Sequence, residues 1–318
     1  MDNISNASGR DEMFYSGQQP WHGKGTRLDS PATAEEALAA AGLNWEVRKV
    51  PLKLDVGLPV SSHVAIVRND TCDILGVVGN RFEPLQNKDA FRFFDAVVGE
   101  KLAIYHTAGA LGKGERIWIL AKLPGTIKVI GEDVIEKYLL LAHAHDGSLR
   151  LTMLFSPIRT VCSNSLNASL SLKTERRATA KHTKNLGLRI GEMRETLGIV
   201  NGLYERLGEM SRHLVGAKMN EKQFAEYAKG VLDVKAEGEL PTRTKNMLEE
   251  VSGLFGQGRG LELAGVRGTA WAGYNAIVEY VDYRRSRTDD SQFNSSLFGE
   301  GAQIKAKAFE SALAFAGK

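Results

Sequence analysis

The sequence predicts an α+β fold, in which a curved antiparallel sheet with a packed helix is followed by an all-helical C-terminal half. Two observations lead to this class. Short β-rich runs bounded by Gly, Asn, Asp or Pro recur from Trp45 to Phe155. After Pro157 the apolar residues recur at helical spacing instead. Because strands and helices occupy separate parts of the chain, the order is not that of a βαβ protein.

The chain begins with a polar segment and a short helix. Residues 1–30 are expected to be a mobile segment, because the N-terminus is polar. A helix over Ala34–Ala41 follows, since the Thr33 side chain can cap toward Glu36 and Gly42 ends the Ala-rich run.

Eight strands and one embedded helix are predicted next. The helix covers Asn87–Val98. The strands cover Trp45–Val50, His63–Arg68, Ile74–Val78, Leu102–His106, Arg116–Leu123, Thr126–Ile130, Tyr138–His145 and Leu149–Phe155.

The last two of these strands form the clearest hairpin. Asp146-Gly147 lies between them, and this dipeptide supplies the positive φ angles of a two-residue type I′ turn. Apolar residues alternate with Arg150 and Thr152 in the second strand. One face of the hairpin is therefore expected to be buried and the other, which carries Arg150, to face solvent.

The remainder of the chain is predicted to be helical. Ser156–Arg159 is expected to open a basic helix that leaves the sheet. A seam of apolar residues then predicts a long helix that packs against another helix. The spacing alternates between four and three over Leu186, Ile190, Met193, Leu197, Val200, Tyr204 and Leu207, and Leu214 follows one heptad later. Further helices are predicted at Asn220–Leu232, Thr242–Phe255, Thr269–Arg285 and Ala302–Ala316.

Composition restricts the class of protein. A chain of 318 residues with 43% hydrophobic content can bury a sizeable core. Cys72 and Cys162 are too few for a disulfide framework, so both are expected to be free thiols in a reducing compartment. The N-terminus lacks a signal-peptide pattern, and the longest apolar run, Tyr138–Ala144, is far shorter than the roughly 20 residues of a membrane helix. A cytoplasmic location is therefore expected.

The net charge of +3 is small, but the positive charge is concentrated. Between Arg150 and Arg194 there are nine Lys or Arg residues and only two acids, Glu175 and Glu192. Because solvated helices usually mix both signs, we prefer a cationic groove for a phosphate backbone over a merely solvated face. The residues expected to contact DNA are Lys113, Arg116, Arg150, Arg159, Asn164, Lys173, Arg176, Arg177, Lys181 and Lys184.

A second group of aromatic and basic residues lies near the C-terminus. Trp271 and Tyr274 fall at helical spacing on one face, so core packing is expected for both. The run Arg284–Arg287 is then the better candidate for a contact with nucleic acid.

Signals for catalysis or cofactor binding are weak. His143 and His145 share a strand face, but no third ligand lies nearby, so no metal site is expected. Cys162 is interpreted as a small buried residue rather than a nucleophile. Gly109–Gly114 lacks the ending of a phosphate-binding loop. We therefore expect no cofactor, no metal and no catalytic residues.

Several stretches together resemble a known family. The most specific are Arg159–Leu166 (RTVCSNSL) and Gly268–Asp282 (GTAWAGYNAIVEYVD), and the likeness extends over nearly the whole chain. The chain resembles the phage/plasmid-like family of uncharacterised proteins carried on prophages and plasmids. This resemblance implies a mobile element as the source and implies no particular activity.

The order of elements is also similar, more distantly, to that of single-strand annealing proteins of the Rad-fifty-two type. Those proteins form rings and hold single-stranded DNA in a basic groove between a sheet and a helix. This resemblance implies a groove helix that carries Arg159, Asn164, Lys173, Arg176 and Arg177. It implies a hairpin wall that carries Arg150, Lys113 and Arg116.

These features lead to one preferred function and two alternatives. The preferred function is a non-enzymatic protein that binds single-stranded DNA, assembles into a homo-oligomeric ring or filament, and anneals strands without ATP. Its parts would be a mobile segment (1–30), an α+β nucleic-acid-binding core (31–185) and a helical region (186–318). The alternatives are a metal-dependent enzyme acting on nucleic acid or nucleotides, and an anti-defence interaction protein.

Overall fold

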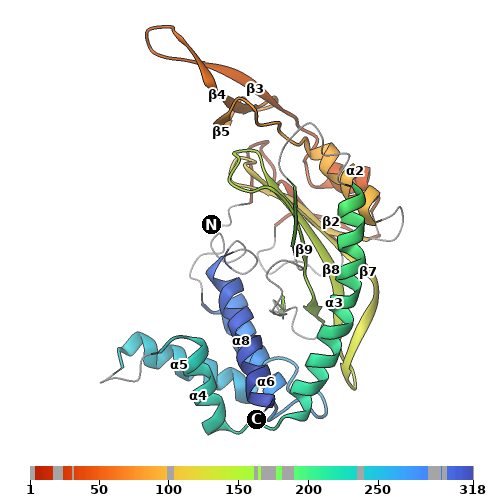
Figure 1. The fold of residues 1–318 in the computed structure, drawn as a ribbon, viewed down its shortest axis with the longest axis vertical. Coiled ribbons are helices and arrows are strands. Elements are labelled where there is room, and N and C mark those ends of the chain that lie inside the picture. Colours follow the sequence, from red (N-terminus) through yellow and green to blue (C-terminus); the bar gives the residue numbers. More distant parts are fainter. Residues whose placement is uncertain are drawn as a thin grey trace.

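The computed structural model describes residues 4–16, 24–30, 32–98, 104–160, 164–165, 177–180, 190–234, 240–285, 295 and 299–317; the side chains of residues 164–165, 177–180 and 190–201 lie outside this description. Within these residues the fold is α+β, as predicted, with a nine-stranded sheet, a three-stranded sheet and a helical C-terminal half (Figure 1). No helix of the described part is both long and apolar enough to cross a membrane.

The main sheet is mixed, since only its β1–β2 pair is parallel. Its order is β11-β10-β8-β7-β6-β1-β2, with β9 beside β8 and β12 beyond β9. Its strands are β1 (Met13–Ser16), β2 (Thr26–Leu28), β6 (Ile104–Leu111), β7 (Arg116–Ile130), β8 (Asp133–Ala144), β9 (Leu151–Phe155), β10 (Ile158–Arg159), β11 (Asn164–Ser165) and β12 (Arg177–Ala180). The two predicted strands within β7 are thus one continuous strand.

The small sheet is antiparallel and consists of β3 (Val47–Lys53), β4 (Pro59–Arg68) and β5 (Ile74–Gly79). Its β3–β4 hairpin extends beyond the rest of the molecule at one end (Figure 1). The inner side chains of this sheet, among them Val47, Ile66 and Val78, join the main hydrophobic core.

The described helices are α1 (Ala34–Ala40), α2 (Asn87–Val98), α3 (Ile190–Gly216), α4 (Glu221–Val231), α5 (Thr242–Gln257), α6 (Ala270–Tyr283) and α8 (Glu300–Ala316). Two of them begin at reciprocal capping contacts. Thr33 and Glu36 cap α1, as the sequence predicts, and Asn220 and Gln223 cap α4 in the same way. These local hydrogen bonds satisfy the free N–H groups of the first turn.

Helix α3 packs against the main sheet along β7 (Figure 1). The Tyr204 ring lies 4.1 Å from the Phe155 ring, and its hydroxyl donates to the Tyr138 carbonyl oxygen at 2.7 Å. In the second half of the predicted seam, Tyr204, Leu207 and Leu214 are fully buried. The seam therefore packs on the sheet as well as on α2, α6 and α8. One hydrophobic cluster continues from the sheet into the helical half, so the two share a core.

The expected mobile N-terminal segment is wrong for residues 4–16. Strand β1 pairs with β6, and Phe14 is fully buried. Before it, the Ser5 N–H donates to the Ala110 carbonyl oxygen at 2.8 Å. Paired backbone and buried side chains make this stretch part of the sheet, although its sequence is largely polar.

The β8–β9 hairpin is confirmed, but its turn is not the predicted two-residue type. Ala142 pairs with Thr152, a register one residue away from the one that a two-residue Asp146-Gly147 turn would impose. This register places Met153 opposite Leu141, and both side chains are in the main core. Burial of the face that carries Leu141 and Met153 therefore sets the register, and the two-residue turn that Asp146-Gly147 favours does not form.

The second face of this hairpin is not a solvent face, contrary to expectation. Thr152 is fully buried. A second cluster covers the face and includes Met13, Trp118 and Leu140, with Leu154 packed against it. Only toward the loop end, at Arg150, is the side chain exposed.

The basic helix expected to open at Ser156–Arg159 is also wrong where the structure describes the chain. Ile158 and Arg159 form β10, which pairs with β8 and β11. Further on, Arg177–Ala180 is strand β12, paired with β9. Strand pairing at the edge of β8 thus replaces the helix predicted from sequence.

Candidate nucleic-acid interface

The candidate interface lies at one end of the main sheet, where the β6–β7 turn and the β8–β9 loop come together. Arg116 is paired with Ala144, and the Ala144 N–H donates to the Leu149 carbonyl oxygen at 3.1 Å. Since neighbouring strands are about 4.8 Å apart, Arg116 and Arg150 lie roughly 10 Å from one another along this row. We call Lys113, Arg116 and Arg150 the cationic rim; all three are exposed.

A buried arginine fixes the turn that carries two of these cations. Arg68 donates to the Lys113 carbonyl oxygen at 2.7 Å. Its guanidinium also contacts the carboxylates of Glu12 and Asp70, each at 2.7 Å, and lies 4.0 Å from the centre of the Trp45 ring. The hydrogen bond from Arg68 holds the pKa of Asp70 below its ordinary value. Arg68 therefore holds in place the turn that carries Lys113 and Arg116.

Glycine is required at the tip of the same turn. Gly114 has a φ of +114°, and a Cβ atom there would lie 2.8 Å from the Trp45 ring. The Lys113 ammonium pairs with Asp73 at 3.2 Å. Hydrogen bonds from Thr71 and then from Lys113 lower the pKa of Asp73. Part of the charge of Lys113 is thus balanced locally.

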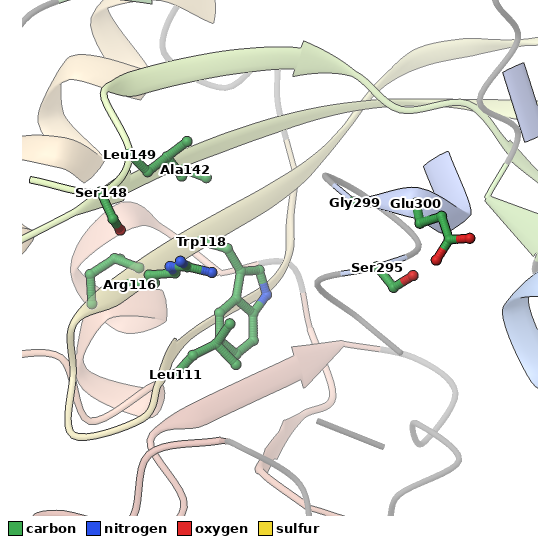
Figure 2. A pocket seen from close by; sticks show the side chains of 10 residues that line it. Leu111, Arg116, Trp118, Ala142, Ser148, Leu149, Ser295, Gly299 and Glu300 are labelled. Atoms are coloured by element: carbon green, nitrogen blue, oxygen red, sulfur yellow. The ribbon is translucent and has the colours of Figure 1, made fainter. Parts of the chain in front are cut away.

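A cavity of about 360 Å³ opens beside Arg116. We call it the sheet-end cavity; its lining residues are Leu111, Arg116, Ile117, Trp118, Ala142, Ser148, Leu149, Ser295, Gly299 and Glu300. Figure 2 shows Trp118 between Arg116 on one side and Ser295 and Glu300 on the other. The walls are mainly apolar, with polar groups at the edges. This combination is typical of sites for small organic groups.

Sequence reasoning missed this cavity. Its far wall comes from the start of α8, where Glu300 accepts from Arg285 at 2.6 Å and this contact lowers the pKa of Glu300. In the sequence, Trp118 is only one residue of the predicted strand Arg116–Leu123. Arg116 is the one lining residue that the sequence predicts as a binding residue. No local pattern joins residues 111–118 to residues 295–300, so the cavity itself has no signal in the sequence.

Arg159, one of the predicted DNA contacts, is not on the surface. Its side chain is 0% exposed and forms a two-point pair with Asp133, at 2.7 and 2.6 Å. Asp133 also accepts from the Trp271 indole N–H at 2.9 Å, and Arg159 donates to the Gly260 carbonyl oxygen at 3.4 Å. We call Asp133, Arg159 and Trp271 the interlock. It joins the main sheet to α6 and cannot contact a ligand.

The other predicted contacts are only partly placed. Asn164 pairs through its backbone with Arg159, and Arg177 pairs with Leu154, a residue of the second sheet face. The side chains of Asn164 and Arg177 lie outside the described part of the chain, as do Lys173, Arg176, Lys181 and Lys184 entirely. The structure therefore brings three of the ten predicted residues together in the rim and removes Arg159.

The C-terminal aromatic residues are in the core, as predicted. Trp271 and Tyr274 are fully buried. Of the basic run that follows them, Arg284 approaches Glu250 at 4.0 Å and Arg285 pairs with Glu300. Arg287 lies outside the described residues.

His143, near the end of β8, and His145, just after that strand, belong to the packed interior. The rings of His143 and His145 meet edge to face at 4.9 Å, and His145 Nε2 is 3.0 Å from the Asn87 side-chain oxygen. Among the residues that the structure describes, no three His, Cys, Asp or Glu side chains are grouped as metal ligands would be. Cys72 is an exposed free thiol, whereas Cys162 lies outside the described part.

Comparison with known proteins gives one match. A family model described as a domain of unknown function (DUF932) matches residues 74–298. Searches of curated proteins and of solved structures returned no significant match. The matched range contains the cationic rim and most of the sheet-end cavity, while Gly299 and Glu300 lie just beyond it.

Proposed function

The chain belongs to the family described as a domain of unknown function (DUF932), and we propose, from its own candidate site, that it binds single-stranded DNA. The observation that carries this proposal is the position of Arg116. This residue lines the sheet-end cavity and also belongs to the cationic rim. Phosphate and base sites would then lie side by side.

The rim suits a phosphate backbone for electrostatic reasons. Lys113, Arg116 and Arg150 project from two loops at one sheet end, so consecutive phosphates of one strand could meet them in turn. Release of counterions from the strand would supply most of the affinity, which makes binding sensitive to salt. The backbone position of Arg177 in β12 would continue this basic line along the sheet edge.

The cavity favours single strands over duplex DNA. Its volume of about 360 Å³ falls at the lower end of small-ligand sites, roughly 300–1,000 Å³, and leaves room for one base but not for a base pair. Trp118 lines the cavity but is only 4% exposed, so a base that enters could touch only a small part of its ring. A paired base could not enter without leaving its helix.

We further propose that the protein anneals complementary strands as a homo-oligomer without ATP. If each subunit holds one base in its cavity, the neighbouring bases stay in solvent and can still pair. Oligomerisation would add many modest contacts along one strand. An origin on a mobile element and a cytoplasmic location agree with this role and are proposed with it.

The proposal is tested by fluorescence anisotropy with a labelled oligonucleotide at several salt concentrations. We expect the wild type to bind the single strand more tightly than the same sequence as duplex. For Arg116→Ala we expect a 3- to 10-fold weaker affinity, with a salt slope shallower by about 0.7 because one phosphate contact is lost.

Arg92→Ala is the matched control, because Arg92 is an exposed arginine of α2, a helix of the opposite sheet face. It should bind like the wild type. Absence of binding at low salt, or equal losses in both variants, would overturn the proposed site.

A second readout reports on the cavity itself. A base that enters should quench the emission of Trp118, and Trp118→Phe should remove the quenching that the oligonucleotide causes. Cleavage of the oligonucleotide in the presence of Mg²⁺ or Mn²⁺ would instead favour the alternative of a metal-dependent enzyme.

A further inference from the structure

Exposed large apolar side chains are concentrated on the small sheet. Of the six in the described part of the chain, five belong to β5 or to the β3–β4 turn. These five are 53–71% exposed: Leu54, Val56, Leu58, Ile74 and Val77. The sixth, Ile104, lies on the main sheet.

The outer face of the small sheet is apolar across all three strands. Val50 pairs with Ala65 and Ala65 with Val77, so these three side chains share one face. In the next row, Val67 pairs with both Arg48 and Ile74. Antiparallel sheets with one solvated face usually carry polar residues there, and here the only polar side chain of the two rows is Arg48.

This face does not belong to the core of the molecule. Ala65 and Val67 are buried, but neither joins either hydrophobic cluster. Ile66, which lies between them and points to the opposite side, is part of the main core. On this same outer side, Ile74 and Val77 of the edge strand β5 are open to solvent.

The adjoining hairpin turn is apolar and preorganised. The Leu54 N–H donates to the Leu58 carbonyl oxygen, and the Gly57 N–H donates to the Leu54 carbonyl oxygen, both at 2.8 Å. Asp55 accepts from the Val56 N–H at 2.8 Å. A turn held in this way loses little conformational entropy when it is covered.

We propose that this outer face, together with the Leu54–Leu58 turn, is the contact surface for a second copy of the chain. Exposed charges of both signs lie on and around this face, with Arg48 and Lys53 beside Glu46 and Asp55. In a two-fold contact this mixture lets the cations of one copy meet the acids of the other.

The size of the surface sets the strength of the association. Three strands about 4.8 Å apart and roughly 20 Å long present only about 300 Å². Stable interfaces bury about 800 Å² per partner, so the sheet face must be supplemented by the turn. We therefore expect the self-association to be weak and reversible, so that it depends on protein concentration.

Sedimentation velocity of the full chain without nucleic acid, from about 1 to 200 µM, tests this inference independently of DNA binding. The wild type should shift from monomer to a larger species as concentration rises. Ile74→Lys and Val77→Lys should each raise the dissociation constant at least tenfold, because a charge would be buried in the contact. Ile104→Lys is the matched control and should associate like the wild type.

Two results would overturn the inference. One is a wild type that stays monomeric over the whole range. The other is an association that both lysine variants retain. Circular dichroism of each variant checks that it is folded. If one lysine variant does not fold, the self-association of the other one tests the inference.

Discussion

Arg116 and Arg159 both lie on strands of the main sheet, and the sequence assigns both to the same DNA-binding surface. In the structure they differ in burial. Arg116 is exposed at the mouth of a cavity, whereas Arg159 has no exposed surface and is bound to Asp133. A buried charge must be matched within the protein, and an exposed charge can be matched by a ligand. Burial therefore separates a stabilising arginine from a binding arginine.

The largest effect should come from breaking the interlock. Asp133→Asn leaves the Arg159 guanidinium buried without its counter-charge, which should lower the free energy of unfolding by about 3–5 kcal/mol. Urea denaturation followed by circular dichroism measures this. Glu132→Gln is the matched control, because Glu132 is the adjacent acid and is exposed, and it should change stability by less than about 0.5 kcal/mol. A loss below 1 kcal/mol in Asp133→Asn would contradict the assigned role.

A smaller loss is expected at the second buried arginine, Arg68. Glu12→Gln removes one of two carboxylates, so Asp70 still neutralises part of the charge, and the expected loss is about 1–3 kcal/mol. Because Arg68 holds the turn at Lys113, DNA affinity should fall as well. Asp70→Asn should cost less stability, since the Asp70 carboxylate is partly exposed. The reverse order of the two variants would show that Asp70 is the main partner.

Arg116→Ala tests the exposed arginine of this pair. Its free energy of unfolding should stay within about 0.5 kcal/mol of the wild type, as for most surface changes, while its DNA affinity falls. Unfolding and anisotropy titrations on the same preparation give both values. A clear loss of stability would place Arg116 with the structural arginines.

The smallest effect on stability is expected at His106 of β6, where burial again acts on a charge. Burial is the main cause that lowers the pKa of His106, although the charge of Glu136 acts in the opposite direction. The folded state therefore binds fewer protons than the unfolded state, and the stability due to neutral His106 is present above pH 6.5 and lost as pH falls through the folded pKa. Between pH 7.5 and 5.0, His106→Gln should lose less stability than the wild type. His63→Gln, at an exposed histidine, should follow the wild type.

Elements with local signals can be predicted from the sequence alone. Thr33 and Glu36 set the start of α1 through hydrogen bonds that span three residues, and Asn220 and Gln223 do the same for α4. The bounds of α2, Asn87–Val98, also agree with the prediction. Such features can be read from sequence because every atom involved lies within one helical turn.

The other features depend on contacts between residues that are far apart in the sequence. Arg159 could not be recognised as buried, because its partners Asp133 and Trp271 lie 26 and 112 residues away along the chain. The sheet-end cavity likewise needs residues 111–149 beside residues 295–300. Strand β10 formed in place of a helix because the edge of β8 offered backbone partners that no local pattern reveals. Long-range pairing and burial, rather than residue type, therefore determine whether Arg159 is buried, where the cavity forms and whether β10 is a strand.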